Sequence, residues 1–167
     1  WFTGVLFGLS LATQSLAFSI LASPPRFEIN TKPGKVVREV ISITNVAQTT
    51  QHVAVSTNDW RFNADNEVEF SETLVQNSCR PWVAIESAQI SLAPTATKRY
   101  RFQVSVPADA PVQECRFAIM LTGDAGVSKG KLALPVSGRI AIIVYVKVGD
   151  AEPVLELKTL SMQANAQ

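Results

Sequence analysis

Polar and apolar residues alternate without a break in KRYRFQVSVP, residues 98–107. One face of an extended chain would carry Tyr100, Phe102, Val104 and Val106, and the other would carry Arg99, Arg101, Gln103 and Ser105. A period of two residues is typical of a β-strand that buries one face. No segment of the chain shows a convincing helical period, so strands have to supply the core.

Turn signals at close spacing divide the rest of the chain into further short strands. Core-facing positions are predicted at Ile41 and Ile43, at Val53 and Val55, and at Phe117, Ile119 and Leu121. Shorter strands are predicted near residues 68–70, 82–85 and 90–92. Pro33 and Gly34 mark a turn. Seven or more strands without a helix predict an all-β fold, an immunoglobulin-like antiparallel β-sandwich, over residues 18–148.

The first 17 residues, WFTGVLFGLSLATQSLA, form an apolar run without charge that ends in Ser15-Leu16-Ala17. Small residues at the last and third-last positions suit signal peptidase. Residues 1–17 are therefore predicted to be part of a signal peptide, inside which the given sequence starts. The run is short for a membrane span, so an N-terminal anchor is the less favoured alternative. Both interpretations place the remainder of the chain outside the cytoplasm.

Cys79 and Cys115 are the two cysteines of the chain. Export to an oxidising compartment favours a disulfide between them. The long loop that this bond would close corresponds to roughly 3–4 kcal/mol of stability. Two free buried thiols are the alternative if the chain is not exported. The cysteines are far apart and His52 is the single histidine, so a zinc site is not predicted.

Residues 149–167 begin with a proline-bearing linker and continue into a short alternating segment. Leu155 and Leu157 fall on one face of this segment, and Glu156 and Lys158 on the other. So short a tail offers it no partner strand. We therefore expect it to be the first strand of a truncated second β domain.

The sequence holds no convincing set of catalytic groups. His52 lies in an alternating strand, where a surface or half-buried position is expected, and no G-x-S-x-G, H-E-x-x-H or P-loop spacing occurs. We predict that the chain is not an enzyme and uses no cofactor, nucleotide or metal. The net charge of +1 gives no strong attraction to nucleic acid.

For three further groups of residues, a structural role is expected rather than a functional one. An acidic cluster is predicted to be a solvated loop rather than a calcium site: Asp59, Asp65, Glu67 and Glu69. The basic residues Lys98, Arg99 and Arg101 are predicted to form a solvated sheet face. Trp60 and Trp82 are predicted to be aromatic residues of the core or its rim.

The long apolar stretch GKLALPVSGRIAIIVYVKV, residues 130–148, is the best candidate for a binding element. Its β-branched residues and its interruptions at Pro135, Ser137 and Arg139 argue against a membrane helix. Residues 139–148 are interpreted as a core strand and residues 131–136 as an exposed edge. Pro135 cannot donate a ladder hydrogen bond, so its nitrogen has to face away from a partner strand.

The order of several segments resembles that of the PapD-like periplasmic pilus-assembly chaperones, as a divergent branch. The segments are SPPRFEI, SITN, NDW, SCRPWV, LAP, KRYRFQVSVPADAP, ECRFAIML and GRIAIIVYVKVGDAEP. The resemblance covers residues 22 to about 155, which would be the N-terminal immunoglobulin-like domain and the linker. It implies a chaperone that lends its last strand to pilus subunits, or other surface-fibre subunits, that lack their own, and that also meets an outer-membrane usher.

The resemblance also assigns residues to this role. The subunit-binding positions would be Leu132, Leu134 and Val136, with Ile140 and Ile142 further along. For Ile140, Ile142, Val144 and Val146, burial in the chain's own core is the favoured interpretation.

In the family, two basic residues grip the carboxylate at the end of the subunit. The matching positions here fall near Glu28 or Ile29 and at Ala141, none of them basic. Arg26 and Arg139 are the nearest candidates, and they need a register shift of two residues. The alternative function is a structural or adhesive envelope domain that lends no strand.

Overall fold

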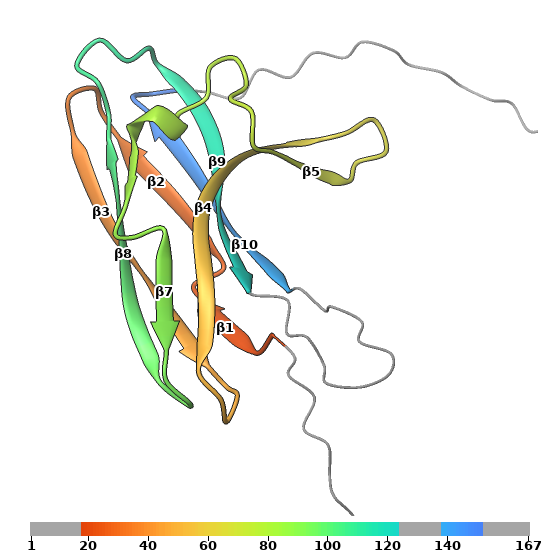
Figure 1. The fold of residues 1–167 in the computed structure, drawn as a ribbon. Coiled ribbons are helices and arrows are strands. Elements are labelled where there is room, and N and C mark those ends of the chain that lie inside the picture. The colour runs from red at the N-terminus through yellow and green to blue at the C-terminus, as the bar shows by residue number, and fades with distance from the viewer. Residues whose placement is uncertain (1–17, 124–137, 152–167) are drawn as a thin grey trace, which may run out of the picture.

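The computed structural model describes residues 18–123 and 138–151, which fold into two β-sheets packed face to face (Figure 1). Ten strands lie in this part of the chain: β1 (Ile20–Ser23), β2 (Arg26–Thr31), β3 (Val36–Asn45), β4 (Gln51–Phe62), β5 (Val68–Ser71), β6 (Val83–Ile85), β7 (Gln89–Leu92), β8 (Thr97–Ser105), β9 (Gln113–Gly123) and β10 (Arg139–Val148). The expected all-β sandwich is confirmed.

The first sheet has the order β1-β3-β8-β6, and all its neighbours are antiparallel. The second has the order β2-β10-β9-β4-β5, and β7 also pairs with β4. Its strands are antiparallel except for β2, which runs parallel to β10. The antiparallel expectation therefore holds for every pair but one.

The core lies between the two sheets and is filled by the predicted alternating positions. Tyr100, Phe102 and Val104 of β8 are at most 2% exposed. Phe117, Ile119 and Leu121 of β9 face them and are 0% exposed. Phe102 meets Phe117 edge to face, with ring centroids 6.4 Å apart. Each such side chain contributes about 1.5–3 kcal/mol through burial, so these two strands form the centre of the sandwich.

The chain changes sheets between its first two strands. β1 pairs with β3 of the first sheet, whereas β2 pairs with β10 of the second. Pro24 and Pro25 lie between them, and the Ser23–Pro24 peptide bond is cis. Proline lacks the N–H that a strand ladder needs, so pairing with β3 stops at Ser23.

The strand predicted near residues 82–85 needs a local correction. Residues 80–82 form a short 3-10 helix, so Trp82 ends that helix and the strand begins at Val83. Pro81 favours this geometry because its fixed φ suits the first turn of a helix. Within residues 18–123 and 138–151, no helix is long and apolar enough to cross a membrane.

The predictions for the two ends of the chain concern residues that the structure does not describe. The signal peptide at 1–17 lies wholly outside the described residues, as does the second-domain strand around Leu155 and Leu157. Both stay predictions.

Candidate functional site

An open backbone edge lies along the first four residues of β10. β9 pairs with the whole strand, from Arg139 to Val148. On the other side, β2 pairs only with Ile143 to Val148. Within the described part of the chain, residues 139–142 therefore have a ladder partner on one side alone. At about 3.3 Å per residue, the free edge is roughly 13 Å long.

The backbone groups along this edge have a defined direction. The carbonyl of Gly138 accepts a hydrogen bond from the N–H of Gly123, at the end of β9, whereas the N–H of Ile143 donates to the carbonyl of Pro25, just before β2. In an antiparallel pair, bonded and non-bonded residues alternate. Arg139 and Ala141 therefore direct their N–H and C=O groups toward the open side. Such groups are a template for an added strand.

The proline pair before β2 sets the length of this edge. β2 is in register with β10 only from Arg26, which lies opposite Ile143. Pro25 precedes it, and β1 belongs to the other sheet. Because the chain joins the second sheet only at Arg26, nothing in β1 or β2 pairs with residues 139–142.

The structure places only some of the predicted subunit-binding residues. Leu132, Leu134 and Val136 lie outside the described residues, and so does Pro135. Ile142 is 0% exposed within the chain's own core, while Ile140 is partly buried at its margin. Core packing, the favoured interpretation for both, is what the structure shows. Their contact with a subunit stays a prediction.

The two candidate anchors for a carboxylate are not brought together. Arg26 lies opposite Ile143, four residues along β10 from Arg139, which corresponds to roughly 13 Å. Arg26 is also engaged locally: its guanidinium lies 4.4 Å from the centroid of the Tyr145 ring and forms an ion pair with Glu28 at 2.5 Å. Its anchoring role stays a prediction, as does that of Arg139.

A second apolar cluster lies on the outer face of the second sheet, away from the main core. Trp60, Ala118 and Met120 form its buried part, and Ala141, Ile143 and Tyr145 pack against it. The Trp60 and Tyr145 rings meet edge to face at 5.4 Å. Arg116 lies 5.1 Å from the centroid of Trp60. Trp60 is thus buried, as expected, but outside the space between the sheets.

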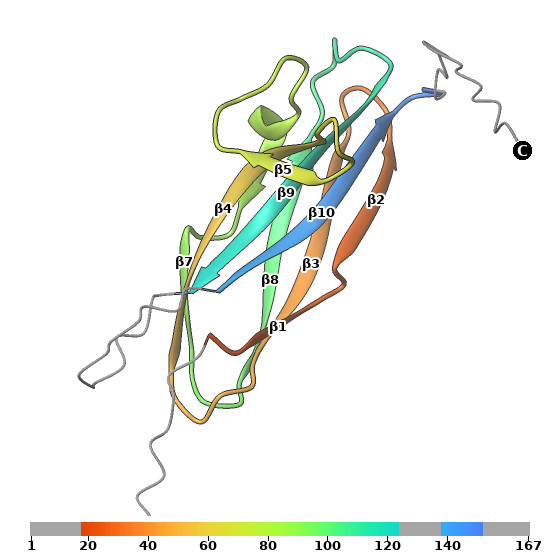
Figure 2. The ribbon, with the colours of Figure 1, turned by 90° about the vertical axis from the view of Figure 1, so that its right-hand side faces the viewer.

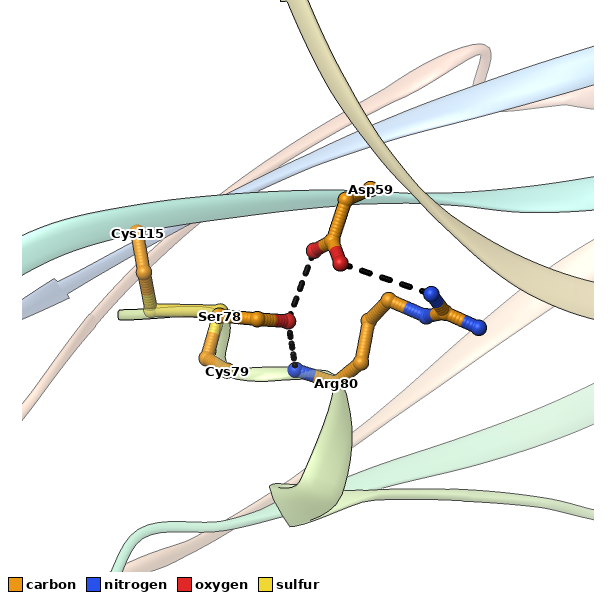
Figure 3. The surroundings of a disulfide bond; sticks show 5 residues. All are labelled: Asp59, Ser78, Cys79, Arg80 and Cys115. Atoms are coloured by element: carbon orange, nitrogen blue, oxygen red, sulfur yellow. Dashed lines mark hydrogen bonds and ion pairs between the residues drawn. A yellow bond between two sulfur atoms is a disulfide. The ribbon is translucent and has the colours of Figure 1, made fainter. Parts of the chain in front are cut away.

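Asp59 corrects the prediction of a solvated acidic loop. Its side chain is almost fully buried, and its carboxylate accepts hydrogen bonds from the Ser78 hydroxyl at 2.7 Å and the Val75 N–H at 3.1 Å. Nη1 of Arg80 lies 3.4 Å from the same carboxylate (Figure 3). Asp59 therefore holds the loop that follows β5. By contrast, Asp65, Glu67 and Glu69 are exposed.

The predicted disulfide between Cys79 and Cys115 is present beside this network (Figure 3). Their Cα atoms are 5.9 Å apart, within the usual range for a bridge. It joins the residue before the short helix to β9, so loop 72–82 is held by a covalent bond as well as by Asp59.

Two of the basic residues predicted to form a solvated sheet face, Lys98 and Arg101, are bound to an acidic side chain. Glu86 binds Nζ of Lys98 at 2.8 Å and accepts a hydrogen bond from the Arg101 N–H at 3.0 Å. These bonds, in that order, lower the pKa of the Glu86 carboxyl below its ordinary value. The Tyr100 hydroxyl donates a hydrogen bond to the Ser87 carbonyl, and burial raises the pKa of the Tyr100 hydroxyl above its ordinary value. These contacts fix the turn before β7.

Groups suited to metal binding are absent from the described ranges, where no cluster of three or more His, Cys, Asp or Glu side chains occurs. His52 is exposed, as predicted.

Several solved structures are similar to this chain in fold. No family model and no curated protein matches the sequence. The class 5 fimbriae chaperone CfaA aligns with a TM-score of 0.58 at 12% identity, over 83% of this chain and 60% of CfaA. The Escherichia coli chaperone DraB aligns at 0.55 and 16% identity, over 82% and 58%. The Salmonella enterica complex of SafA pilin with the SafB chaperone aligns at 0.56 and 14%, over 84% and 59%.

These matches define the class of fold. The chain has the PapD-like immunoglobulin-like β-sandwich fold, and the three structures named above are those of chaperones, one of them in complex with a pilin. The resemblance inferred from the sequence is thereby confirmed for the fold. This chain spans about three fifths of the length of those structures.

Proposed function

We propose that this chain is a periplasmic chaperone that binds and caps pilus or fimbrial subunits by lending them a β-strand, without catalysis. The open edge of β10 at residues 139–142 is the observation that carries the proposal. The likeness in fold to structures described as chaperones supports it, and one of them holds a pilin.

The mechanism follows from the chemistry of an incomplete sandwich. A subunit that lacks a strand exposes an unpaired backbone edge and an apolar groove, and both promote aggregation. The backbone groups of Arg139 and Ala141 would begin a ladder with that edge. Further toward residue 131, Leu132, Leu134 and Val136 would place side chains in successive pockets of the groove, two residues apart.

The side-chain faces along β10 are consistent with core packing by its residues and subunit binding by the residues before it. Ile142 is enclosed by this chain's own core and Ile140 lies at its margin. Leu134 and Val136 share the parity of these residues in the sequence. On an extended strand they would continue the same face beyond the sandwich, where a subunit could receive them.

Capture of a subunit tests the proposal. A pilus subunit that lacks its last strand would be co-expressed with this chain in a bacterial periplasm and recovered through a tag on this chain. We expect Leu134→Glu to abolish capture, because a carboxylate in an apolar pocket is costly to desolvate. Leu21→Glu is the matched control, since Leu21 is 61% exposed on β1 in the other sheet. Equal capture by the two variants would contradict strand lending and favour an envelope domain without chaperone activity.

The carboxylate anchor and the usher belong to the same proposal. Arg26→Ala and Arg139→Ala should each weaken capture of a subunit with a free C-terminal carboxylate. Neither substitution should change the capture of a subunit whose last residues have been deleted. Loss of capture that is the same for both subunits would contradict an anchoring role. Binding to an outer-membrane usher would be measured separately, with the purified usher.

A further inference from the structure

Exposed apolar side chains are concentrated in one part of the described structure. Nine large apolar residues of residues 18–123 and 138–151 are exposed. Five of them lie between residues 59 and 80, on the β4–β5 hairpin or the loop that follows: Phe62, Val68, Phe70, Leu74 and Val75. We call these five residues the hairpin face. Scattered exposed apolar residues are ordinary, but a contiguous group indicates an interaction surface.

The strand register places the aromatic part of the hairpin face on one side of the hairpin. Phe62 lies opposite Val68, and Trp60 lies opposite Phe70. Directly opposed residues of a strand pair share a face. The Trp60 ring packs edge to face against the Phe62 ring, with ring centroids 5.5 Å apart, and it also packs against the Tyr145 ring on β10. The hairpin face is thus continuous, through Trp60, with the apolar cluster on the outer face of the second sheet. In Figure 2, β5 lies in front of β9 of that sheet.

The charge of this segment differs from that of the rest of the chain. Residues 59–80 contain five acids (Asp59, Asp65, Glu67, Glu69 and Glu72) and two bases (Arg61 and Arg80), a net charge of −3. The whole chain is +1, so the remainder carries +4. Both bases are paired, Arg61 with Glu69 and Arg80 with Asp59. In the described structure, Asp65, Glu67 and Glu72 are left without a basic partner.

The apolar and acidic groups also meet in one hollow. A surface cavity of about 350 Å³ beside the hairpin is lined by Trp60, Phe70 and Val75, by the ion pair of Arg61 with Glu69, and by Glu72, which has no basic partner in the described structure. The methylene stem of a lysine or arginine can cover aromatic surface while its charged end reaches a carboxylate. This combination fits a basic side chain carried by an apolar segment.

We propose that the hairpin face binds a segment of another protein in which apolar side chains alternate with lysine or arginine. The apolar residues would cover Phe62, Val68 and Phe70, and a basic side chain would enter the hollow near Glu72. A second copy of this chain fits less well, because two hairpins would bring two charges of −3 together. The five residues of the hairpin face lie on the β4–β5 hairpin and the loop after it, and none of them belongs to the open edge of β10, so the inference goes beyond the proposed chaperone function.

Peptide binding to the full chain tests this inference. The probe is a short labelled peptide in which lysine alternates with valine and phenylalanine, followed by fluorescence anisotropy. One control peptide has glutamate in place of each lysine, and another has serine in place of each apolar residue. We expect binding of the lysine–apolar peptide alone, weakened by added salt because the contributing charges are exposed.

Variants assign the binding to the hairpin face. The double variant Phe62→Ser with Phe70→Ser should lower the affinity for the lysine–apolar peptide by about tenfold or more, as expected for a central apolar contact. Glu67→Lys with Glu72→Lys should reverse the preference toward the glutamate peptide. The controls are Leu21→Ser, an exposed apolar residue of β1, and Asp109→Lys, an exposed acid before β9. Neither should change the affinity, and thermal unfolding would verify that every variant is folded.

Four results would each overturn the inference. They are no binding of the lysine–apolar peptide, equal binding of the lysine and glutamate peptides, unchanged affinity in both double variants, and dimerisation of the chain that Phe70→Ser abolishes. Binding that is lost in Leu134→Glu and kept in the hairpin variants would place the peptide at β10 instead. That outcome also overturns the inference, while it leaves the proposed chaperone function intact.

Discussion

The carboxylate of Asp59, on β4, lies 3.4 Å from the guanidinium of Arg80, the residue that follows Cys79 of the disulfide. The side chains of Asp59 and Arg80 are 2% and 14% exposed, so this ion pair is largely buried, with the carboxylate almost fully enclosed. It fixes the loop between β5 and β6 to the second sheet. The same loop carries two residues of the hairpin face, Leu74 and Val75.

Removing the Asp59 carboxylate should destabilise the fold. Asp59→Ala leaves the Arg80 charge and the Ser78 hydroxyl without their buried acceptor. Loss of one partner of a buried pair costs about 3–5 kcal/mol, which urea unfolding would measure. Glu69→Ala is the matched control, because its ion pair with Arg61 is exposed and worth at most about 1 kcal/mol. Equal losses in the two variants would contradict the role assigned to Asp59.

The disulfide should contribute a comparable stabilisation by a different mechanism. It joins Cys79 to Cys115, which are 36 positions apart in the sequence. On the chain-entropy model, replacing both cysteines with serine lowers the free energy of unfolding by about 3–4 kcal/mol. Reduction of the original chain should lower the urea midpoint by the same amount as the double substitution. A loss below about 1 kcal/mol would show that the loop is ordered without the bond.

Part of the dependence of stability on pH should trace to Glu86. Its pKa is lowered by hydrogen bonds from Lys98 and from the backbone N–H of Arg101, so folding favours the charged carboxylate. This stabilisation is complete above the ordinary glutamate pKa of about 4.3 and is lost as the pH falls through the lowered value. Glu86→Gln should therefore flatten the decline of the urea midpoint below pH ~4. Glu72→Gln serves as the control, and an unchanged slope in Glu86→Gln would refute the assignment.

Phe18 and Gly123 should show strong energetic coupling. A Cβ atom added at Gly123 would overlap the ring of Phe18, which also covers Gly138. Gly123→Ala should cost about 1–3 kcal/mol through overpacking. In a Phe18→Ala background the same change should be nearly neutral, and a double-mutant cycle would measure this difference. An equal cost in both backgrounds would show that Phe18 does not occupy this position.

Much of the sandwich could be predicted from local patterns. The alternation at Tyr100 and Phe102 placed β8, and residues 139–148 were predicted as the strand that the structure shows as β10. The disulfide followed from two cysteines and an expected export signal. These inferences succeed because side chains alternate with the backbone period of a strand, whatever its partner.

The candidate site depended on information that alternation does not contain. The acidic pattern around Asp59 suggested a solvated loop, yet Asp59 is buried against Arg80, a residue that sequence reasoning did not single out. Trp60 was expected in the core or on its rim, but it packs on the outer face of a sheet beside Tyr145. Both positions result from contacts between strands that are distant in the sequence.

The sequence by itself determined that the chain forms strands, which apolar side chains of the regularly alternating strands face the core, and that two cysteines could bridge them. Only the tertiary structure decided that β2 joins β10 in parallel from Arg26 onward and leaves residues 139–142 open. The reason is physical: the period of two fixes the faces of each strand, but hydrogen-bonded edges are satisfied only by a neighbour. That neighbour is set by the packing of the whole chain.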